Sequence, residues 1–171
     1  VYKRQGGAGE QCLEVMQKVK ELLDQGGRLE EAVSEEIANH RQTKGKYIPG
    51  FGHRFHKPED PRAPRLMKLV SDAEGEKLVS GNFMRIGLEI QRQLSQGKST
   101  GIAMNIDGAT AVIFGELGFA PPLARGLFCL SRSVGILAHA WEQKNQGGRN
   151  KGPTPPEFLW NYSGKNPLTE G

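Results

Sequence analysis

A chain of 171 residues with 36% hydrophobic side chains is long enough for one domain, or for part of a larger protein. Its net charge of +4 and its pI of about 9.1 are only mildly basic. Nucleic-acid binding is not favoured, because the sequence has no binding motif and its basic residues lack interleaved aromatic residues.

The predicted elements are helices throughout, because apolar residues recur at helical spacing and no stretch alternates as a strand does. In chain order we predict helices over residues 10–25 and 29–44, from residue 60 past residue 73, over 82–96 and 107–118, and from residue 121 onward. The Gly- and Pro-rich segment from residue 147 is predicted to be irregular. The fold class is therefore all-α.

The last of these helices has the apolar character of a membrane span over residues 123–141. Arg125, Arg132 and His139 lie within that stretch, and ionisable side chains are costly in lipid without partners. We therefore predict a helix that is buried in protein, with His139 as a packed residue within it, and no membrane association.

The sequence predicts no metal site. His53 and His56 are three residues apart, but no cysteine or further histidine completes a ligand set. Cys12 and Cys129 lie in apolar helical patterns, so we expect free buried thiols and a cytoplasmic location. His40 is predicted to be a surface residue.

The most informative segment is residues 49–55, Pro-Gly-Phe-Gly-His-Arg-Phe, followed by Asp60-Pro61-Arg62. Proline and glycine allow the backbone to pass close to a ligand. His53 exchanges a proton near neutral pH, and Arg62 can bind a planar carboxylate through two parallel hydrogen bonds. With Asp60 as N-cap and Pro61 as the first helical residue, Arg62 is predicted to lie on the first helical turn beside the histidine loop.

Basic residues crowd this stretch, and two interpretations stay open. They bind a small polyanion such as a phosphorylated cofactor, or they form the solvated face of a helix. The residues concerned are Arg54, Lys57, Arg62, Arg65 and Lys68.

Two further groups contain charged residues among apolar ones. Asp107 follows an apolar run within residues 105–109, where burial would raise its pKa and helix-start amides would lower it; it is otherwise a helix N-cap. Arg132 lies mid-helix within residues 128–133, and a buried arginine needs an anionic partner. That partner is a bound carboxylate or an acidic residue of the protein.

Taken in order, the motifs P-G-F-G-H, D-P-R, N-I-D-G and S-R-S-V-G-I-L-A-H resemble the citrate synthase superfamily, which includes citrate synthase, methylcitrate synthase and citryl-CoA lyase. The resemblance covers nearly all of residues 6–164. It is closest to the bacterial citryl-CoA lyase-like branch, on G-F-G-H-R-F-H, D-P-R-A-P-R-L and M-N-I-D-G-A-T-A. It implies an all-helical homodimer, in which residues 6–118 form the small domain and residues 119–171 the C-terminal part of the large domain.

The resemblance also implies roles. His53 is the general acid on the oxaloacetate carbonyl, and Asp107 is the base that takes a proton from the acetyl-CoA methyl group. Arg62 and Arg132 bind the substrate carboxylates, and Phe128 packs beside the substrate. The implied CoA contacts are Ile48, Pro49, Gly50, Phe51, Gly52 and Arg54. No cofactor is bound permanently, because the CoA thioester is itself a substrate.

Two departures from the family pattern are visible. The family has a second catalytic histidine immediately before a G-G-A stretch, and Gln5 holds that place here. We therefore expect residues 1–5 to be a non-native joining sequence and the natural protein to extend upstream. The family's late R-P motif is replaced by K-G-P-T-P-P at residues 151–156, with Arg149 out of register, which favours the lyase-like branch or a different oxo acid.

The leading hypothesis is an enzyme that makes or cleaves the bond between acetyl-CoA and oxaloacetate, with citryl-CoA as the lyase substrate. The alternatives are a true citrate or methylcitrate synthase, and a non-catalytic acyl-CoA or carboxylate-binding module, which Gln5 would favour. Because we expect the N-terminal helices of the large domain to be missing, we predict weak or no turnover by the 171-residue chain itself.

Overall fold

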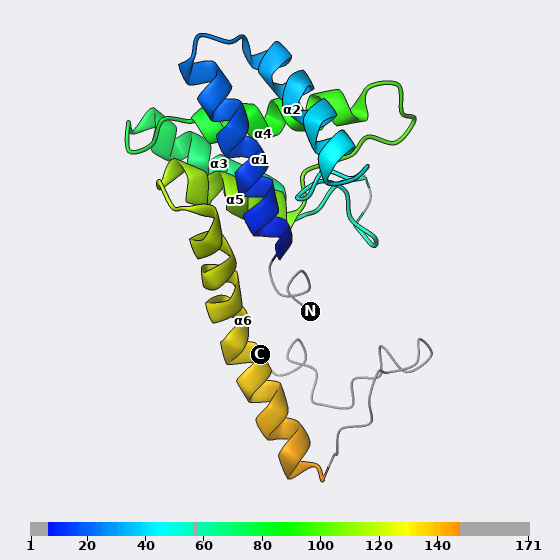
Figure 1. The fold of residues 1–171 in the computed structure, drawn as a ribbon. Helices are drawn as coiled ribbons and strands as arrows, with labels where there is room; N and C mark the ends of the chain where they lie inside the picture. The colour runs from blue at the N-terminus through cyan, green and yellow to red at the C-terminus, as the bar shows by residue number, and fades with distance from the viewer. Residues whose placement is uncertain (1–6, 57, 148–171) are drawn as a thin grey trace. The chain divides into compact units, whose positions relative to one another are not determined.

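The computed structural model of the chain describes residues 7–56 and 58–147. Within these residues lie the helices α1 (Gly7–Asp24), α2 (Leu29–Thr43), α3 (Ala63–Gly75), α4 (Asn82–Ser95), α5 (Ile106–Glu116) and α6 (Pro121–Asn145) (Figure 1). The same part of the chain contains no strand, and its isolated β-bridge pairs Phe51 with Met104. The predicted all-α fold is therefore confirmed, and each of the predicted helices begins within three residues of the observed start.

The helix predicted to start at Asp60 begins instead at Ala63. The Asp60 carboxylate does accept the backbone N–H of Arg62 at 3.1 Å, and its carbonyl accepts that of Ala63. These bonds close a tight turn before the helix. The same carboxylate also binds the Arg62 side chain and the N–H of Ile106, so it is not committed to capping α3. The prediction of Asp60 as the N-cap is therefore wrong.

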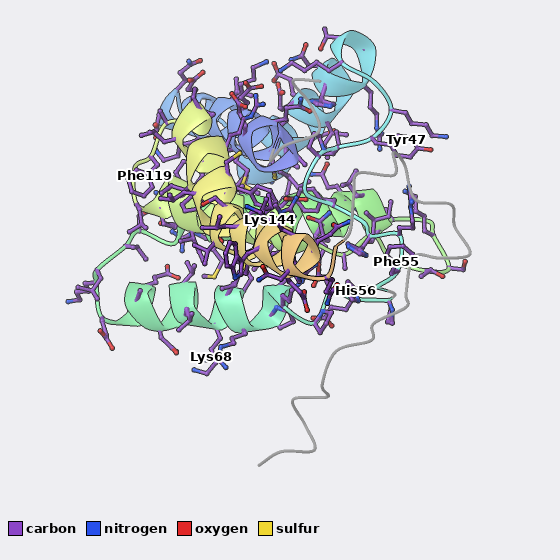
Figure 2. The ribbon with its side chains drawn as sticks, turned by 90° about the horizontal axis from the view of Figure 1, so that it is seen from below. Tyr47, Phe55, His56, Lys68, Phe119 and Lys144 are labelled. Carbon is purple, nitrogen blue, oxygen red and sulfur yellow. The ribbon has the colours of Figure 1, made fainter. Side chains whose placement is uncertain are left out.

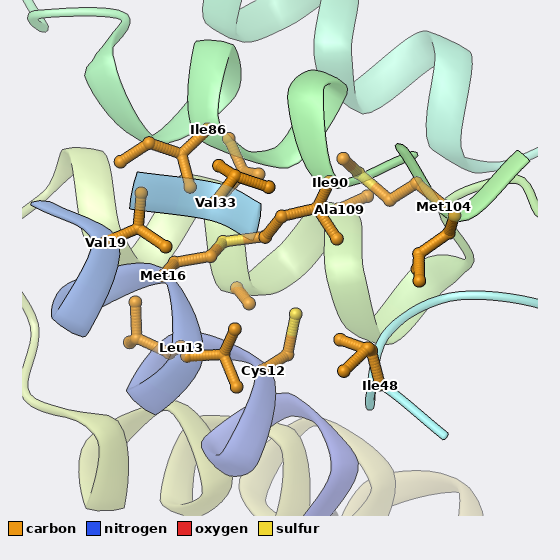
Figure 3. Packing of buried hydrophobic residues seen from close by; sticks show 14 of the residues in the cluster. Cys12, Leu13, Met16, Val19, Val33, Ile48, Ile86, Ile90, Met104 and Ala109 are labelled. Atoms are coloured by element: carbon orange, nitrogen blue, oxygen red, sulfur yellow. The ribbon is translucent and has the colours of Figure 1, made fainter. Parts of the chain in front are cut away.

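The hydrophobic core lies where α1, α2, α4 and α5 pack together (Figure 3). Apolar residues recur every three or four positions on these helices, so that one face of each is buried. Burial of a large aliphatic side chain contributes about 1.5–3 kcal/mol to stability. The core therefore fixes the helices whose connecting loops carry the candidate site. Its most deeply buried members include Leu13, Met16, Val19, Val33, Ile86, Ile90, Ala109 and Val112.

The prediction that α6 is buried is wrong for the described residues. Ala124 is its one buried residue, and Cys129, also predicted to be buried, is half-buried. The apolar pattern predicts that this helix has an apolar face, but a pattern does not identify what covers it. None of the described helices is long and apolar enough to cross a membrane. The exposed apolar residues of α6 include Leu130, Val134, Leu137 and Trp141.

The chain divides within α6 into two compact units, Val1–Arg132 and Ser133–Gly171. In the first unit, α1 packs against both α2 and α5, and α4 bridges α2 and α5. All the residues discussed below as a candidate site belong to this first unit. The division predicted from the family resemblance, at residue 118, stays a prediction.

Two histidine predictions are wrong in opposite directions. His40, expected at the surface, is 3% exposed, and this burial lowers the pKa of its imidazole. Its position three residues after the buried Ile37 places it on the core face of α2, which explains the burial. His139, expected to be packed, is an exposed side chain 3.6 Å from Glu142.

Candidate active site

The loop that carries His53 packs directly onto the N-terminus of α5. Gly50 has a φ of +86°, and a Cβ atom there would lie 2.9 Å from the Cα of Gly108 and still closer to the Sγ of Cys12. A Cβ on Gly108 would overlap the carbonyl oxygen of Gly50. Both positions therefore require glycine, because two backbones meet without room for a side chain.

Asn105 joins this loop to α5. Its side-chain oxygen accepts the N–H groups of Asp107 and Gly108 at 2.9 and 3.2 Å, which makes it the N-cap of α5. Its amide group donates to the carbonyl of Gly52 at 2.7 Å, one residue before His53. The alternative interpretation of Asp107 as the N-cap is therefore wrong, because Asp107 lies inside the first turn.

The His53 imidazole is held in one orientation by its own loop. Its Nδ1 accepts the backbone N–H groups of Phe55 and His56, each at 3.0 Å, and its ring lies 4.4 Å from the His56 ring between centroids. Because Nδ1 is an acceptor, the proton of the neutral imidazole is on Nε2. His53 can therefore offer an N–H donor to a ligand, and it lines a cavity of about 180 Å³ together with Asp60 and Asn105.

Asp60 and Arg62 form a bidentate ion pair in the turn before α3. Asp60 Oδ1 accepts Arg62 Nε at 2.9 Å, and Oδ2 accepts Nη2 at 2.8 Å. Oδ2 also accepts the N–H of Ile106 at 3.1 Å, so this turn is bonded to the start of α5. The hydrogen bonds from Arg62 hold the pKa of the Asp60 carboxyl well below its usual range.

The predicted polar residues meet around Asp107. Burial raises the pKa of its carboxyl, while the charges of Arg132, Arg62 and His53 oppose that rise and the charge of Asp60 adds to it. These four groups therefore lie close enough to Asp107 to act on it electrostatically. Three separate segments of the chain, around residues 53, 62 and 132, converge on one carboxylate.

Arg132 differs from its prediction in one respect. It is exposed, not buried, and it forms no salt bridge with the described residues. Its guanidinium carbon lies 4.3 Å from the centroid of the Phe128 ring, one helical turn earlier. The stacking fixes the guanidinium on the helix surface without an internal acidic partner. Of the two partners considered from the sequence, an acidic residue is therefore not found in a salt bridge with Arg132 among the described residues.

The predicted CoA loop borders a groove of about 410 Å³. Ile48 and Phe51 line it, together with the exposed Tyr47. Figure 2 labels Tyr47 and, later in the chain, Phe55 and His56. Gly50 and Gly52 use their carbonyl groups within the protein, since these accept from the backbone and side chain of Asn105. Three cations also line the groove and were missed by sequence reasoning: Arg41, Lys46 and Lys98.

No local signal could have found this cationic set, because its members come from α2, the following loop and the loop after α4. In the predicted basic stretch, Arg54 is exposed with its guanidinium 5.9 Å from the Phe55 ring, and Lys68 pairs with Asp72. The predictions for Gln5, Lys57 and residues 149–156 lie outside the described residues. In the described ranges, no group of three His, Cys, Asp or Glu side chains is arranged to hold a metal ion.

Comparison with known proteins gives consistent matches. Residues 3–153 match the family described as citrate synthase, C-terminal domain. A citrate synthase of Acidithiobacillus ferridurans is 30% identical over 151 residues, which cover 87% of this chain and 36% of that protein. A second citrate synthase, from Saccharolobus solfataricus, is 29% identical over 140 residues and is covered over 34% of its length. The chain thus spans about a third of the length of these curated relatives.

Solved structures show the same fold. The structure of citryl-CoA lyase from Hydrogenobacter thermophilus is 29% identical, with a TM-score of 0.68 over 96% of this chain and 60% of that one. Citrate synthase from Thermotoga maritima is 28% identical, with a TM-score of 0.61 over 97% of this chain and 42% of that one. Both kinds of enzyme are therefore represented among the structural relatives.

Proposed function

We propose that this chain, which belongs to the citrate synthase family, carries the acid–base pair and carboxylate clamps of an enzyme that makes or cleaves the carbon–carbon bond between acetyl-CoA and oxaloacetate. One observation carries the proposal: the His53 loop, through Gly52, and the Asp60–Arg62 turn are both hydrogen-bonded to the start of α5, beside the partly buried Asp107. We favour a citryl-CoA lyase, with citrate or methylcitrate synthase as the alternative. The whole protein is proposed to be a cytoplasmic homodimer.

Asp107 is assigned the role of base. Its carboxylate takes a proton from the acetyl-CoA methyl group, and the electron pair of that C–H bond forms the enolate carbon that attacks the ketone. Burial raises the pKa of this carboxyl, so it holds a proton more strongly than an exposed aspartate does. In the cleavage direction the protonated Asp107 returns that proton to the enolate carbon.

His53 is assigned the role of acid. Its Nε2–H donates to the oxaloacetate carbonyl oxygen and transfers the proton as that oxygen becomes the citryl hydroxyl. Water then returns a proton to Nε2. The two N–H groups bound to Nδ1 fix the tautomer that this role needs. In cleavage the neutral imidazole is restored as the hydroxyl proton passes the other way.

Arg62 and Arg132 are assigned to the two carboxylates of oxaloacetate, with Phe128 beside the bound substrate. Both guanidinium groups are at least partly exposed, and both lie close enough to lower the pKa of Asp107, which supports a shared ligand. Holding the ketone against the attacking carbon removes a large entropic cost. A bound dicarboxylate would supply the anionic partner that Arg132 lacks among the described residues.

The groove beside the His53 loop is assigned to CoA. Ile48 and Phe51 supply apolar contacts for an adenine ring, with Pro49, Gly50 and Gly52 as the loop backbone and Arg54 at its exposed end. The lining cations suit the phosphates of CoA, each of which carries negative charge. Within this proposal these are Arg41, Lys46 and Lys98.

Ligand titration of the purified chain by NMR tests the site. We expect oxaloacetate to shift the backbone signals of His53, Arg62 and Asp107, and CoA to shift those of Ile48 and Phe51. Arg62→Ala should abolish the oxaloacetate response, whereas the matched change Arg65→Ala, at an exposed position of α3, should leave it intact. Unchanged spectra at millimolar ligand concentrations would contradict the proposal.

Product analysis with citryl-CoA separates the two enzymes. A lyase yields acetyl-CoA and oxaloacetate, whereas a synthase mainly yields citrate and free CoA. We expect the lyase products from the whole protein that contains this sequence. Asp107→Asn should lower the rate by about 10²–10⁴-fold, the usual contribution of a positioned acid or base.

A non-catalytic binding module is the second candidate, and Gln5 is the observation that favours it. Glutamine at this position donates a hydrogen bond but cannot act as an imidazole does. A module would bind both ligands in the NMR titration and would convert no citryl-CoA in the whole protein. In that outcome Asp107→Asn would change ligand binding, and neither the parent nor the variant would convert citryl-CoA.

A further inference from the structure

We infer that Asp60 is a positioning residue, which orients the Arg62 guanidinium so that one of its edges is held free for a carboxylate ligand. The inference rests on the function proposed above and deepens it. Asp60 itself does not touch the substrate in this proposal. It acts through Arg62 and through the start of α5.

The geometry of the pair defines which edge is used. Asp60 occupies the Nε and Nη2 edge of the guanidinium with bonds of 2.9 and 2.8 Å. A guanidinium has five N–H donors, so Nη1 and the second hydrogen of Nη2 form a further fork. The described residues place no hydrogen-bond acceptor on Nη1. This remaining edge matches a carboxylate in width and direction.

Burial is unequally divided across the pair. The Asp60 side chain is 1% exposed, whereas the Arg62 side chain is 49% exposed. The carboxylate is thus a fixed anchor inside the protein, and the guanidinium extends from it toward solvent. A long side chain loses rotamer freedom when a ligand binds it, and the anchor supplies that ordering beforehand.

Asp60 also links the clamp to the proposed base. Its Oδ1 accepts the Arg62 N–H at 3.1 Å, and its Oδ2 accepts the Ile106 N–H at 3.1 Å. Ile106 directly precedes Asp107 in the first turn of α5. One carboxylate therefore sets the distance between the residue that would hold oxaloacetate and the residue that would deprotonate acetyl-CoA.

An ordinary surface ion pair provides the contrast. Lys68 and Asp72 in α3 also form two close contacts, of 2.9 and 2.7 Å, but both side chains are exposed. Such pairs typically contribute little to stability and order nothing else. Asp72→Asn is therefore a matched control for Asp60→Asn, because each change removes one charge from a bidentate pair with a cation.

Binding of oxaloacetate to the chain, measured by calorimetry, is the first test. We expect Asp60→Asn to weaken binding by about 10- to 100-fold, the cost of losing hydrogen bonds to a charged group. Asp72→Asn should remain within twofold of the parent. Because Asp60 acts through Arg62, Asp60→Asn should have no further effect in a chain that already carries Arg62→Lys. Full additivity of the two changes would overturn the inference.

A second readout does not depend on oxaloacetate. Asp107 is faced by Cys12, His53, Asp60, Arg62 and Arg132. Removal of the Asp60 charge should lower the pKa of Asp107, followed by the ¹³C carboxyl signal, and should speed exchange of the Arg62 Nε proton with water. A merely structural residue would not produce both changes in a chain that stays folded.

The outcomes are distinguishable. If the parent chain does not bind oxaloacetate, the proposed function fails, and the Asp107 titration and the Arg62 proton exchange still decide the inference. If Asp60→Asn does not fold, Asp60→Glu replaces it; we expect tenfold or greater weakening, because the longer side chain cannot keep the fork and the Ile106 bond together. A folded Asp60 variant with parent binding, or one in which both spectroscopic signals are unchanged, would overturn the inference.

Discussion

Asp60 and Asp107 lie on adjoining segments and have opposite environments. Asp60 is fully buried and accepts hydrogen bonds from Arg62 and Ile106, so its pKa is held well below the usual range. Asp107 is half-buried, its carboxylate accepts no hydrogen bond from the described residues, and burial raises its pKa. The more buried of the two carboxylates is thus the one that stays charged more readily.

The difference shows that burial alone does not set the state of a carboxyl group. Desolvation disfavours the charge in both residues, but donors directed at Asp60 outweigh it. Asp107 has cations nearby without hydrogen bonds to them, so desolvation prevails there. A carboxylate that the protein leaves unsatisfied is available to take a proton, whereas a satisfied one supports the structure.

The largest expected effect comes from separating the two segments. Gly108→Ala should destabilise the chain by about 2–4 kcal/mol, because its Cβ would overlap the backbone oxygen of Gly50. Gly126→Ala in α6 is the control, since no atom lies within 4 Å of its Cβ position and alanine favours a helix. Urea denaturation monitored by circular dichroism measures both. Equal midpoints for the two variants would show that the glycine contact is not required.

Asp60→Asn should follow, with a loss of about 1–3 kcal/mol at neutral pH. The folded pKa of Asp60 lies below the unfolded value of 3.8, so its contribution is present above that pH. It is lost as the pH falls toward the lower folded value. Unfolding free energies of parent and variant, measured from pH 7 to pH 2, should therefore converge at acid pH. A constant gap over this range would contradict the assigned ion pair.

Asn105→Ala tests the hydrogen bonds by which Asn105 connects the His53 loop to the start of α5. We expect a loss of about 1–2 kcal/mol, because the N-cap of α5 and the bond to Gly52 are both removed. Asn82→Ala serves as the reference, because Asn82 is the first residue of a helix whose first N–H groups are accepted by Glu116, and not by the Asn82 side chain. Thermal unfolding of the two variants gives the comparison. A larger loss of stability in Asn82→Ala than in Asn105→Ala would contradict the importance assigned to the Asn105 cap.

Asp107→Asn should have the smallest effect and the opposite sign. Its folded pKa is raised, so the charged carboxylate costs free energy above that pH and nothing below the unfolded value of 3.8. The variant should gain less than about 1 kcal/mol at neutral pH, because partial exposure screens the charge. The gain should vanish at acid pH. Destabilisation at neutral pH would mean that Asp107 is stabilised in the same way as Asp60.

Local patterns in the sequence predicted most of the helices but not the relations between distant residues. The spacing of apolar residues in α1 or α4 repeats within a few helical turns, so the approximate limits of each helix can be predicted from it. The role of Asp60 depends on Ile106, which lies 46 residues away. Nothing in the segment around Asp60 distinguishes that tertiary bond from an ordinary N-cap, and the N-cap was therefore predicted.

The candidate site shows the same division. His53, Arg62 and Asp107 were singled out because their residue types stand in unusual local contexts, and the structure brings them together. Asn105 was passed over although it lies two residues before the predicted helix start, close to where a cap is expected. The exposure of α6 could not be predicted, because an apolar pattern gives no information about the surface that covers it.

Cys12 lies beneath the contact between the His53 loop and α5, where it is fully buried and the pKa of its thiol is raised by that burial. We expect a thiol-alkylating reagent to label it only after local opening of the structure around it, such as separation of the loop from the helix. The labelling rate of Cys12 should therefore report how often this region opens. Cys129, half-buried in α6, calibrates the reagent in the same molecule. Labelling of Cys12 can be followed by mass spectrometry without an added probe. A ligand that stabilises the loop against opening should slow this labelling.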